Sequence, residues 1–249
     1  MVYEKKEILE YWNRNDVESM YDKNLLNAEV ELIKWRIPPN TKICDMGCGE
    51  GESTLIYSNI PGVAVHAFDF SETRLRLARE RLKGQKNVIL KKVDFLKEFC
   101  FDKDYDIVVS QRFLINITEW NLQKNALLNL MAMLKPGGKL LMLEGSIQGA
   151  DSLNEFRKIW GLGPICIKWH NLFFDNHMLI EFMQRHGYKL VETDGLGAYF
   201  FLTRGVRPNL DKNLNWDCDF NRKASKKRMK DLLKFYTKFS RLNLWVFQK

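Results

Sequence analysis

The chain of 249 residues contains no uninterrupted apolar run that approaches the ~20 residues a helix needs to cross a bilayer. Its charged start also lacks the apolar core of a secretory signal. The five cysteines form neither a CxxC pair nor an even set typical of a disulfide framework. No cluster of metal ligands, internal repeat or low-complexity segment is evident. These absences predict a cytoplasmic, reduced protein without a membrane span and without a bound metal.

The composition is that of an ordinary globular protein, with 45% hydrophobic and 28% charged residues. The length suits one α/β domain with insertions, or at most two small domains. Much of the net charge of +8 comes from basic residues between Arg222 and Arg241. Such a run is typical of a solvated helix face, but it would also suit a phosphate-bearing small substrate or an anionic polymer.

Short apolar segments alternate with helical segments through the middle of the chain. Strands are predicted at 42–46, 62–68, 87–93, 105–110 and 139–144, and helices at 52–59, 71–82 and 120–134. Ser71 is a plausible N-cap for the second of these helices. Because the strands are almost continuously apolar, we expect a parallel sheet covered on both faces.

The remaining segments complete one domain, 1–249, with a seven-stranded, mostly parallel sheet. Helices are predicted at 4–35, 152–160 and 176–187, and strands at 188–192 and 243–248. Residues 145–175 and 196–240 are interpreted as insertions that form a substrate cap. Residues 1–40 are interpreted as a helical lid, in which Tyr11, Trp12 and Tyr21 either cover a ligand or pack on the core.

A glycine-rich turn follows the first strand. Asp45 ends the strand, and Gly47, Gly49 and Gly51 occupy alternate positions before a helical segment. A strand, glycine turn and helix in succession allow backbone N–H groups to approach a ligand closely. The dinucleotide-binding fingerprint would require glycine at position 52, where the chain has Glu52.

Acidic residues also end the next two strands, Asp69 in Ala-Phe-Asp-Phe-Ser and Asp94 in Val-Asp-Phe. A carboxylate at the end of the second strand can accept both hydroxyls of a ribose. Leu-Lys-Pro-Gly-Gly-Lys-Leu-Leu precedes the fifth strand. In this order and spacing, the motifs of residues 41–145 resemble those of class I S-adenosylmethionine (SAM) methyltransferases.

The resemblance implies a Rossmann-like fold, SAM as cofactor and S-adenosylhomocysteine as its product. It implies that Asp45 helps to hold the methionine end of SAM, Asp69 the ribose and Asp94 the adenine. The other residues expected at the cofactor are Gly47, Cys48, Gly49, Gly51, Phe70, Phe95 and Gln111.

The acceptor is less well defined. The Asn/Asp-Pro-Pro-Tyr/Phe motif of enzymes that methylate nucleic-acid amino groups is absent after the fourth strand, where residues 110–117 read Ser-Gln-Arg-Phe-Leu-Ile-Asn-Ile. Arg112 and Asn116 are candidates for contacts with substrate, although Arg112 could instead pair with a carboxylate.

A methyl acceptor that arrives as an alcohol needs a base. His170, which titrates near neutral pH, is the first candidate base or substrate contact, although a lone histidine is often structural. Glu144 is the rival base, and Arg112 is a third catalytic candidate. Asn116, Asn171, Tyr199 and Arg204 are candidate substrate contacts. Arg204 and Arg207 would suit a phosphate group, or they are ordinary surface arginines.

Four stretches, 111–116, 144–149, 153–154 and 169–171, are also similar to bacterial methyltransferases that modify polysaccharides and sugars. This second resemblance implies O-methylation of a small or sugar-linked substrate, possibly one that bears a phosphate or nucleotide. The alternatives are an RNA methyltransferase, suggested by the basic run, and a non-catalytic SAM-binding subunit. The sequence leaves the oligomeric state open.

Overall fold

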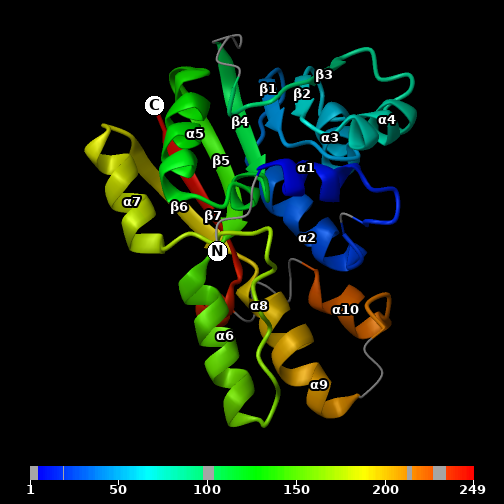
Figure 1. Ribbon diagram of the computed structural model, residues 1–249, viewed down its shortest axis with the longest axis vertical. Coiled ribbons are helices and arrows are strands. Elements are labelled where there is room, and N and C mark those ends of the chain that lie inside the picture. The colour runs from blue at the N-terminus through cyan, green and yellow to red at the C-terminus, as the bar shows by residue number, and fades with distance from the viewer. Residues whose placement is uncertain (1–4, 19, 98–103, 212–214, 227–233) are drawn as a thin grey trace.

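The computed structural model describes residues 5–18, 20–97, 104–211, 215–226 and 234–249 (Figure 1). Seven strands form one sheet in the order β3-β2-β1-β4-β5-β7-β6. They are β1 (Lys42–Met46), β2 (Ala64–Asp69), β3 (Val88–Lys92), β4 (Tyr105–Gln111), β5 (Leu134–Gly145), β6 (Lys189–Gly195) and β7 (Leu242–Gln248). β7 is antiparallel to β5 and β6, and the other pairings are parallel. The predicted seven-stranded, mostly parallel, Rossmann-like sheet is confirmed.

Side chains along the central strands alternate between two apolar clusters, one on each face of the sheet. In β5, Leu141 and Leu143 belong to one cluster, and Leu140 and Met142 belong to the other. The first cluster includes residues of α2 (Lys23–Lys34), α3 (Glu52–Ser58) and α6 (Ile147–Ile159). The second includes residues of α5 (Trp120–Ala132) and α7 (Asn176–Arg185). Burial on both faces explains why the strands are almost continuously apolar.

The glycine turn leads from β1 into α3, and Ser71 caps α4 (Glu72–Arg81) by accepting a hydrogen bond from the Arg74 amide. α4 contacts β2, β3 and α3. β5 is longer than predicted, because residues 134–138 continue the strand. The register with β4 is irregular there, between Tyr105 and Ile107.

The N-terminal helix predicted at 4–35 is two helices, α1 (Lys5–Asn13) and α2. Asp22 starts α2 as its N-cap, accepting from the Leu25 amide. The carbonyls of Trp12, Arg14 and Val17 accept hydrogen bonds from the Arg74 side chain. These bonds satisfy the backbone outside a helix, so the chain turns between α1 and α2.

The helix predicted at 152–160 begins earlier, because Ser146 caps α6 by accepting from the Gly149 amide. The sequence does not predict the first turn of α6, because this turn contains Gly149 and glycine weakens a helix interior. Here it permits close packing, because a Cβ at Gly149 would lie 1.7 Å from the Ser240 carbonyl oxygen.

The segment between β6 and β7 contains short helices that the sequence analysis did not identify. They are α8 (Gly197–Phe200), the π-helical η2 (Phe201–Val206), α9 (Arg207–Leu210), α10 (Asp219–Ala224) and the 3₁₀ segment η3 (Lys234–Phe239). In Figure 1, α8, α9 and α10 gather with α6 at one end of the molecule. Lys227, Arg228 and Lys230 of the basic run lie outside the described residues.

Within the described ranges, no helix combines the length and the apolar character needed to cross a membrane. The same ranges contain no group of three His, Cys, Asp or Glu side chains placed to hold a metal ion. Cys44, Cys48, Cys166 and Cys218 are free thiols.

Candidate active site

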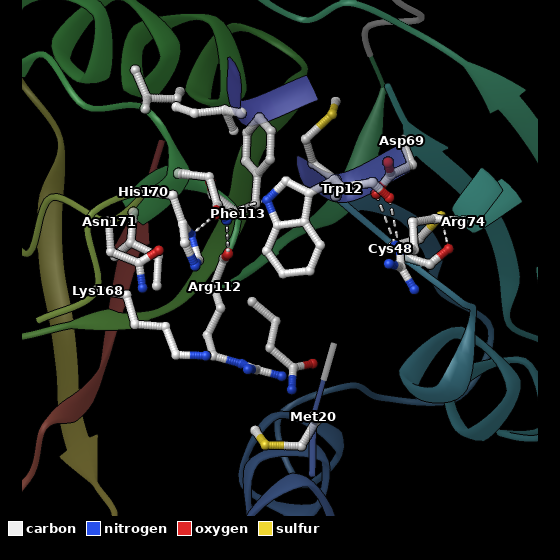
Figure 2. A pocket seen from close by; sticks show the side chains of 18 of the residues that line it. Trp12, Met20, Cys48, Asp69, Arg74, Arg112, Phe113, Lys168, His170 and Asn171 are labelled. Atoms are coloured by element: carbon white, nitrogen blue, oxygen red, sulfur yellow. Dashed lines mark hydrogen bonds between the residues drawn. The ribbon is translucent and has the colours of Figure 1, made fainter. Parts of the chain in front are cut away.

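A cavity of about 400 Å³ lies at the carboxyl ends of β1 to β4 and is also lined by residues of the N-terminal helices and of both insertions. Its size is that of a small-molecule site. Figure 2 shows Asp69 and Arg74 at one side of the cavity and Lys168 and His170 at the other, with Trp12 between them. We refer to these two parts as the acidic end, at Asp69, and the histidine end, at His170.

The three glycines of the turn have positive φ angles, of 75° at Gly47, 54° at Gly49 and 75° at Gly51, but they serve different purposes. A Cβ at Gly47 would lie 2.7 Å from the Phe113 side chain, whereas one at Gly49 would meet no atom within 4 Å and would enter the cavity. Gly51 does not line the cavity and packs against Leu82 instead. Its prediction as a cofactor contact is therefore wrong.

Asp69 joins the glycine turn to the start of α4. One carboxylate oxygen accepts from the Gly49 amide at 2.9 Å, and the other accepts from the Ser71 amide at 2.8 Å. Burial raises the pKa of Asp69. Burial also raises the pKa of Asp45 to about 6, and the Thr54 hydroxyl donates to this carboxylate at 2.5 Å. Each Asp69 oxygen retains a lone pair that can accept from a ligand hydroxyl.

The other predicted cofactor contacts lie on the cavity wall: Cys48, Phe70, Asp94, Phe95 and Gln111. The Gln111 side chain is fixed, since it accepts from the Ser53 hydroxyl at 2.8 Å and donates to Glu29 at 2.7 Å. The donor and acceptor set fits SAM. Carboxylates from consecutive strand ends can receive an ammonium group, a ribose diol and an adenine amino group, and Gly49 leaves room for the ligand.

His170 is held in one orientation at the histidine end. The Asn116 amide nitrogen donates to the Arg112 carbonyl at 2.7 Å, so the Asn116 oxygen is the acceptor for other groups. That oxygen lies 3.2 Å from His170 Nδ1 and also accepts from Trp12 Nε1 at 3.2 Å. The Tyr11 ring stacks on the imidazole with a centroid separation of 4.6 Å. We infer that Nδ1 carries the proton and that Nε2 presents a lone pair.

His170 Nε2 is buried and has no hydrogen-bond partner among the described residues, and the side chain lines the cavity. Burial, with the nearby Lys168 charge, lowers the pKa of His170 to about 4, and the adjacent Asn171 side chain opposes this shift only in part. The imidazole is therefore neutral at physiological pH. The buried Asn171 Oδ1 likewise has no partner among the described residues, and Asn171 also lines the cavity. Both atoms can accept a hydrogen bond from a ligand.

Arg112 lines the cavity and pairs with a carboxylate, the alternative that the sequence left open. Its Nε donates to Glu29 Oε2 at 3.1 Å, and Glu29 is fully buried. Burial raises the pKa of Glu29, while Arg112 and Gln111 favour its charged form. Arg112 has a φ of 53°, which is uncommon for a non-glycine residue and often marks a functional site.

The predicted residues of the second insertion separate into two groups. Arg204 lines the cavity and pairs with Asp22. Tyr199 is buried outside the cavity, and its hydroxyl donates to Asp22 at 2.9 Å. Arg207 is also buried away from the cavity and donates to Asn221 at 3.1 Å. Tyr199 therefore does not contact a substrate in this geometry, contrary to the prediction, and Arg207 fits neither alternative, a phosphate ligand or a surface arginine.

Glu144 does not line the cavity, and its carboxylate accepts several hydrogen bonds. Oε1 accepts from the Ser110 hydroxyl at 2.6 Å and from the amides of Phe113 and Leu114 at 3.0 and 2.9 Å. Oε2 accepts from the Ile115 amide at 3.2 Å. Burial raises the pKa of Glu144 to about 7. Glu144 therefore shapes the turn after β4, and this geometry contradicts its prediction as a base.

The sequence analysis missed several side chains at the cavity. Met20, Phe113, Lys168 and Arg241 line it, and Glu29 supports Arg112 from α2. Only Lys168 had a local signal, because it directly precedes Trp169 and His170 in an insertion that the sheet does not need.

Comparison with known proteins agrees with this geometry. A family model described as a methyltransferase domain matches residues 43–138. Over 124 residues, the chain is 32% identical to a ubiquinone/menaquinone biosynthesis C-methyltransferase of Vibrio campbellii, covering 47% of this chain and 46% of the relative. Over 199 residues, it is 26% identical to a demethylmenaquinone methyltransferase of Staphylococcus carnosus, covering 75% of this chain and 80% of the relative.

A solved SAM-dependent methyltransferase of Geobacter sulfurreducens, in complex with S-adenosylhomocysteine, shares the fold with a TM-score of 0.54. The two chains are 17% identical, and the match covers 97% of this chain and 96% of that one. The chain spans less than half the length of the Vibrio relative. None of these relatives supports the predicted resemblance to polysaccharide-modifying enzymes. Residues 43–138 therefore match a methyltransferase-domain family, and the chain as a whole shares the fold of the solved SAM-dependent methyltransferase.

Proposed function

We propose that this protein transfers the methyl group of SAM to a small molecule that presents a hydroxyl group to His170. One observation carries the proposal. The acidic end, which fits SAM, and the unpartnered Nε2 of His170 belong to the same cavity.

Bound SAM supplies an activated methyl group on a sulfonium leaving group, so the protein has mainly to align the reactants and exclude water. His170 Nε2 accepts the hydrogen bond of the acceptor hydroxyl and orients the oxygen. Asn116 and Tyr11 hold the imidazole in this orientation. With a pKa of about 4, His170 is a weak base and receives the proton only as the acceptor loses its electron pair to the methyl carbon.

O-methylation is the simplest outcome for such an acceptor. A second candidate is methylation at a ring carbon beside a phenolic hydroxyl, which would donate to His170 in the same way. The names of the quinone-modifying relatives favour this candidate. The apolar lining, which includes Ile8, Leu25, Leu26, Ile117, Phe173 and Phe200, suits a ring or an alkyl body better than a sugar or a polynucleotide.

The first test is the transfer of labelled methyl from SAM into a host extract that is separated by molecular size, with and without ribonuclease. We expect label in the small, ribonuclease-insensitive fraction. Label that ribonuclease removes from the large fraction would favour RNA. Absence of label, with SAM binding established, would leave a non-catalytic SAM-binding subunit.

The role of His170 is tested with His170→Ala, for which we expect about a 100-fold loss of kcat. The affinity for S-adenosylhomocysteine should be unchanged, because His170 lies at the other end of the cavity. His186→Ala is the matched control, since His186 is exposed at the end of α7. Turnover of His170→Ala near that of the control would remove His170 from the mechanism.

A further inference from the structure

Arg241 is a buried cation at the histidine end. It directly precedes β7, is 8% exposed and lines the cavity. Its Nη1 donates to the Ile165 carbonyl at 2.9 Å and its Nη2 to the Cys166 carbonyl at 3.5 Å. Its guanidinium lies 5.5 Å from the Phe173 ring centroid. Among the described residues, no carboxylate lies within ion-pairing distance of Arg241.

The surroundings of Arg241 are positively charged. Burial lowers the pKa of Arg241, and Arg204 and Arg157 lower it further. Removing a charge from water without a counter-ion costs free energy. The fold therefore maintains an unfavourable charge at this position, which an anionic ligand would offset.

The charges of the wider histidine end do not balance. Four cationic side chains line it: Arg112, Lys168, Arg204 and Arg241. Two carboxylates pair with them, Glu29 with Arg112 and Asp22 with Arg204. Four positive charges less two negative charges leave an excess of two, at Lys168 and Arg241.

The remaining acidic side chains on the wall come from other elements. They lie at the ends of β1 and β2, in the turn and first residue that lead into α3, after β3 or just before α5, and they are Asp45, Asp69, Glu50, Glu52, Asp94 and Glu119. Lys168 is exposed, and its ammonium lies 5.9 Å from the Tyr21 ring centroid. No carboxylate within the described ranges pairs with Lys168. The cavity is thus divided into an acidic end and a cationic histidine end.

We propose that the methyl acceptor is an organic anion, whose carboxylate or phosphate group binds Arg241 and Lys168 while its apolar body packs against the cavity wall. This inference rests on the proposed function, because it names the acceptor of the same site. Two N–H groups of Arg241 donate to backbone carbonyls, so three of its five remain for a ligand. A guanidinium fork matches both carboxylate and phosphate.

The sheet gives an approximate length for this acceptor. β7 lies two positions from β4 in the strand order, so the two strands are roughly 10 Å apart. Arg241 directly precedes β7, and Gln111 is the last residue of β4. Because Gln111 is an expected contact of the cofactor, we infer that the anionic group lies several bonds from the methylated atom. A neutral quinone would leave both unpaired cations without a partner.

Calorimetric titration with hexanoate, hexyl phosphate and 1-hexanol tests the inference on protein with and without saturating S-adenosylhomocysteine. These probes share an alkyl body and differ in charge. We expect at least one anion to bind ten- to a hundredfold more tightly than the alcohol, the range for hydrogen bonds to charged groups. Tighter binding of hexanoate would indicate a carboxylate site, and tighter binding of hexyl phosphate would indicate a phosphate site. Equal affinity for all three probes would overturn the inference.

Variants assign the effect to the named residues. Arg241→Gln and Lys168→Gln should each weaken anion binding about tenfold and leave hexanol binding unchanged. Lys158→Gln is the matched control, because Lys158 is exposed on α6 and does not line the cavity. Lys168 is exposed, so its variant tests the inference even if Arg241→Gln fails to fold. Unchanged anion binding in Lys168→Gln and Arg241→Gln would contradict the assignment.

An independent test applies the labelled product of the extract assay to an anion-exchange resin. We expect the resin to retain the label and concentrated salt to release it. A neutral labelled product would overturn the anionic acceptor and leave methyl transfer intact. Absence of any labelled product reports on the proposed function, whereas a neutral labelled product reports on the anionic acceptor, so the two failures are distinguishable.

Discussion

At the scale of single residues, burial sets the charge state of the groups that face the cavity. Burial raises the pKa of Asp45 to about 6 and lowers that of His170 to about 4, so each shift favours the neutral form. The consequences differ at pH 7. His170 is neutral and can accept a hydrogen bond, whereas Asp45 is ionised, but by a margin of only about one pH unit.

We therefore predict that the affinity for S-adenosylhomocysteine depends on pH through Asp45. Above pH 6 the carboxylate can attract the ammonium group at the methionine end, whereas below pH 6 it is protonated and loses this attraction. Affinity should fall as the pH decreases from 7 to 5, by up to about tenfold per unit below pH 6. Calorimetry across this range measures it.

Asp45→Asn is the control, since it removes the titrating group and keeps the shape of the side chain. Its affinity should be lower at pH 7 and nearly independent of pH. If the wild type and Asp45→Asn showed the same slope, another group, such as Asp69, would be responsible.

The sequence located the residues at strand ends better than those that reach the cavity from other elements. Asp45, Asp69 and Asp94 end consecutive parallel strands, and such ends meet at one edge of a sheet, so their proximity follows from the strand pattern. Glu29 and Arg241 reach the cavity from α2 and from the start of β7. Their positions depend on tertiary packing, which no local pattern in the sequence records.

At the scale of elements, one side chain of α4 holds the segment that follows α1. Arg74 is almost fully buried and donates from Nε to the Trp12 carbonyl at 3.0 Å. Its Nη2 donates to the carbonyls of Arg14 and Val17, at 3.0 and 2.7 Å, and its Nη1 to Glu50 at 2.6 Å. Trp12 in turn bonds Asn116, so Arg74 supports the histidine end through α1.

We predict that Arg74→Met loosens residues 5–17. Three hydrogen bonds from a charged donor to this segment are lost, so hydrogen exchange there should accelerate at least tenfold. Exchange in α5 should not change. Arg79→Met is the matched control, because Arg79 lies on the exposed side of the same helix and pairs with Glu72. Equal exchange of residues 5–17 in both variants would show that Arg74 does not hold α1.

The boundaries of elements were predictable where a local cap decides them and not where a distant contact does. Ser71 was recognised as the N-cap of α4. The division of α1 from α2 depends on Arg74, some 60 residues away in the chain. The start of α6 was missed because Gly149 is needed for contact with Ser240, which lies 91 residues later in the chain. The short helices of 196–240 likewise pack on one another and on α6.

At the scale of the whole molecule, the alternating apolar strands determine the sheet and its two covered faces, and these were predictable. The individual side chains of the cavity wall were predictable only in part, because that wall combines α1, α2, both insertions and the ends of four parallel strands. A ligand that fills the cavity contacts parts of the chain that are far apart in sequence. Binding should therefore stabilise the domain as a whole.

Gly49 and Gly137 allow this coupling to be measured with matched variants. Both have positive φ angles, 54° and 77°, and an added Cβ would meet no atom within 4 Å at either position. Alanine at each should cost a similar amount, about 1 kcal/mol of backbone strain. Of the two, only Gly49 lines the cavity, whereas Gly137 lies at the opposite end of the parallel strands, in the irregular part of β5 between Leu134 and Lys139.

At a concentration 100 times its Kd, S-adenosylhomocysteine should stabilise the wild type by about 2.7 kcal/mol, which raises Tm by roughly 5–10 °C. Gly137→Ala should start from a lower Tm and keep this full increase. Gly49→Ala should start from a similarly lower Tm and lose most of it, because its methyl group occupies ligand space. Differential scanning calorimetry separates the two effects. An equal ligand-induced increase in both variants would show that the cofactor does not lie against Gly49.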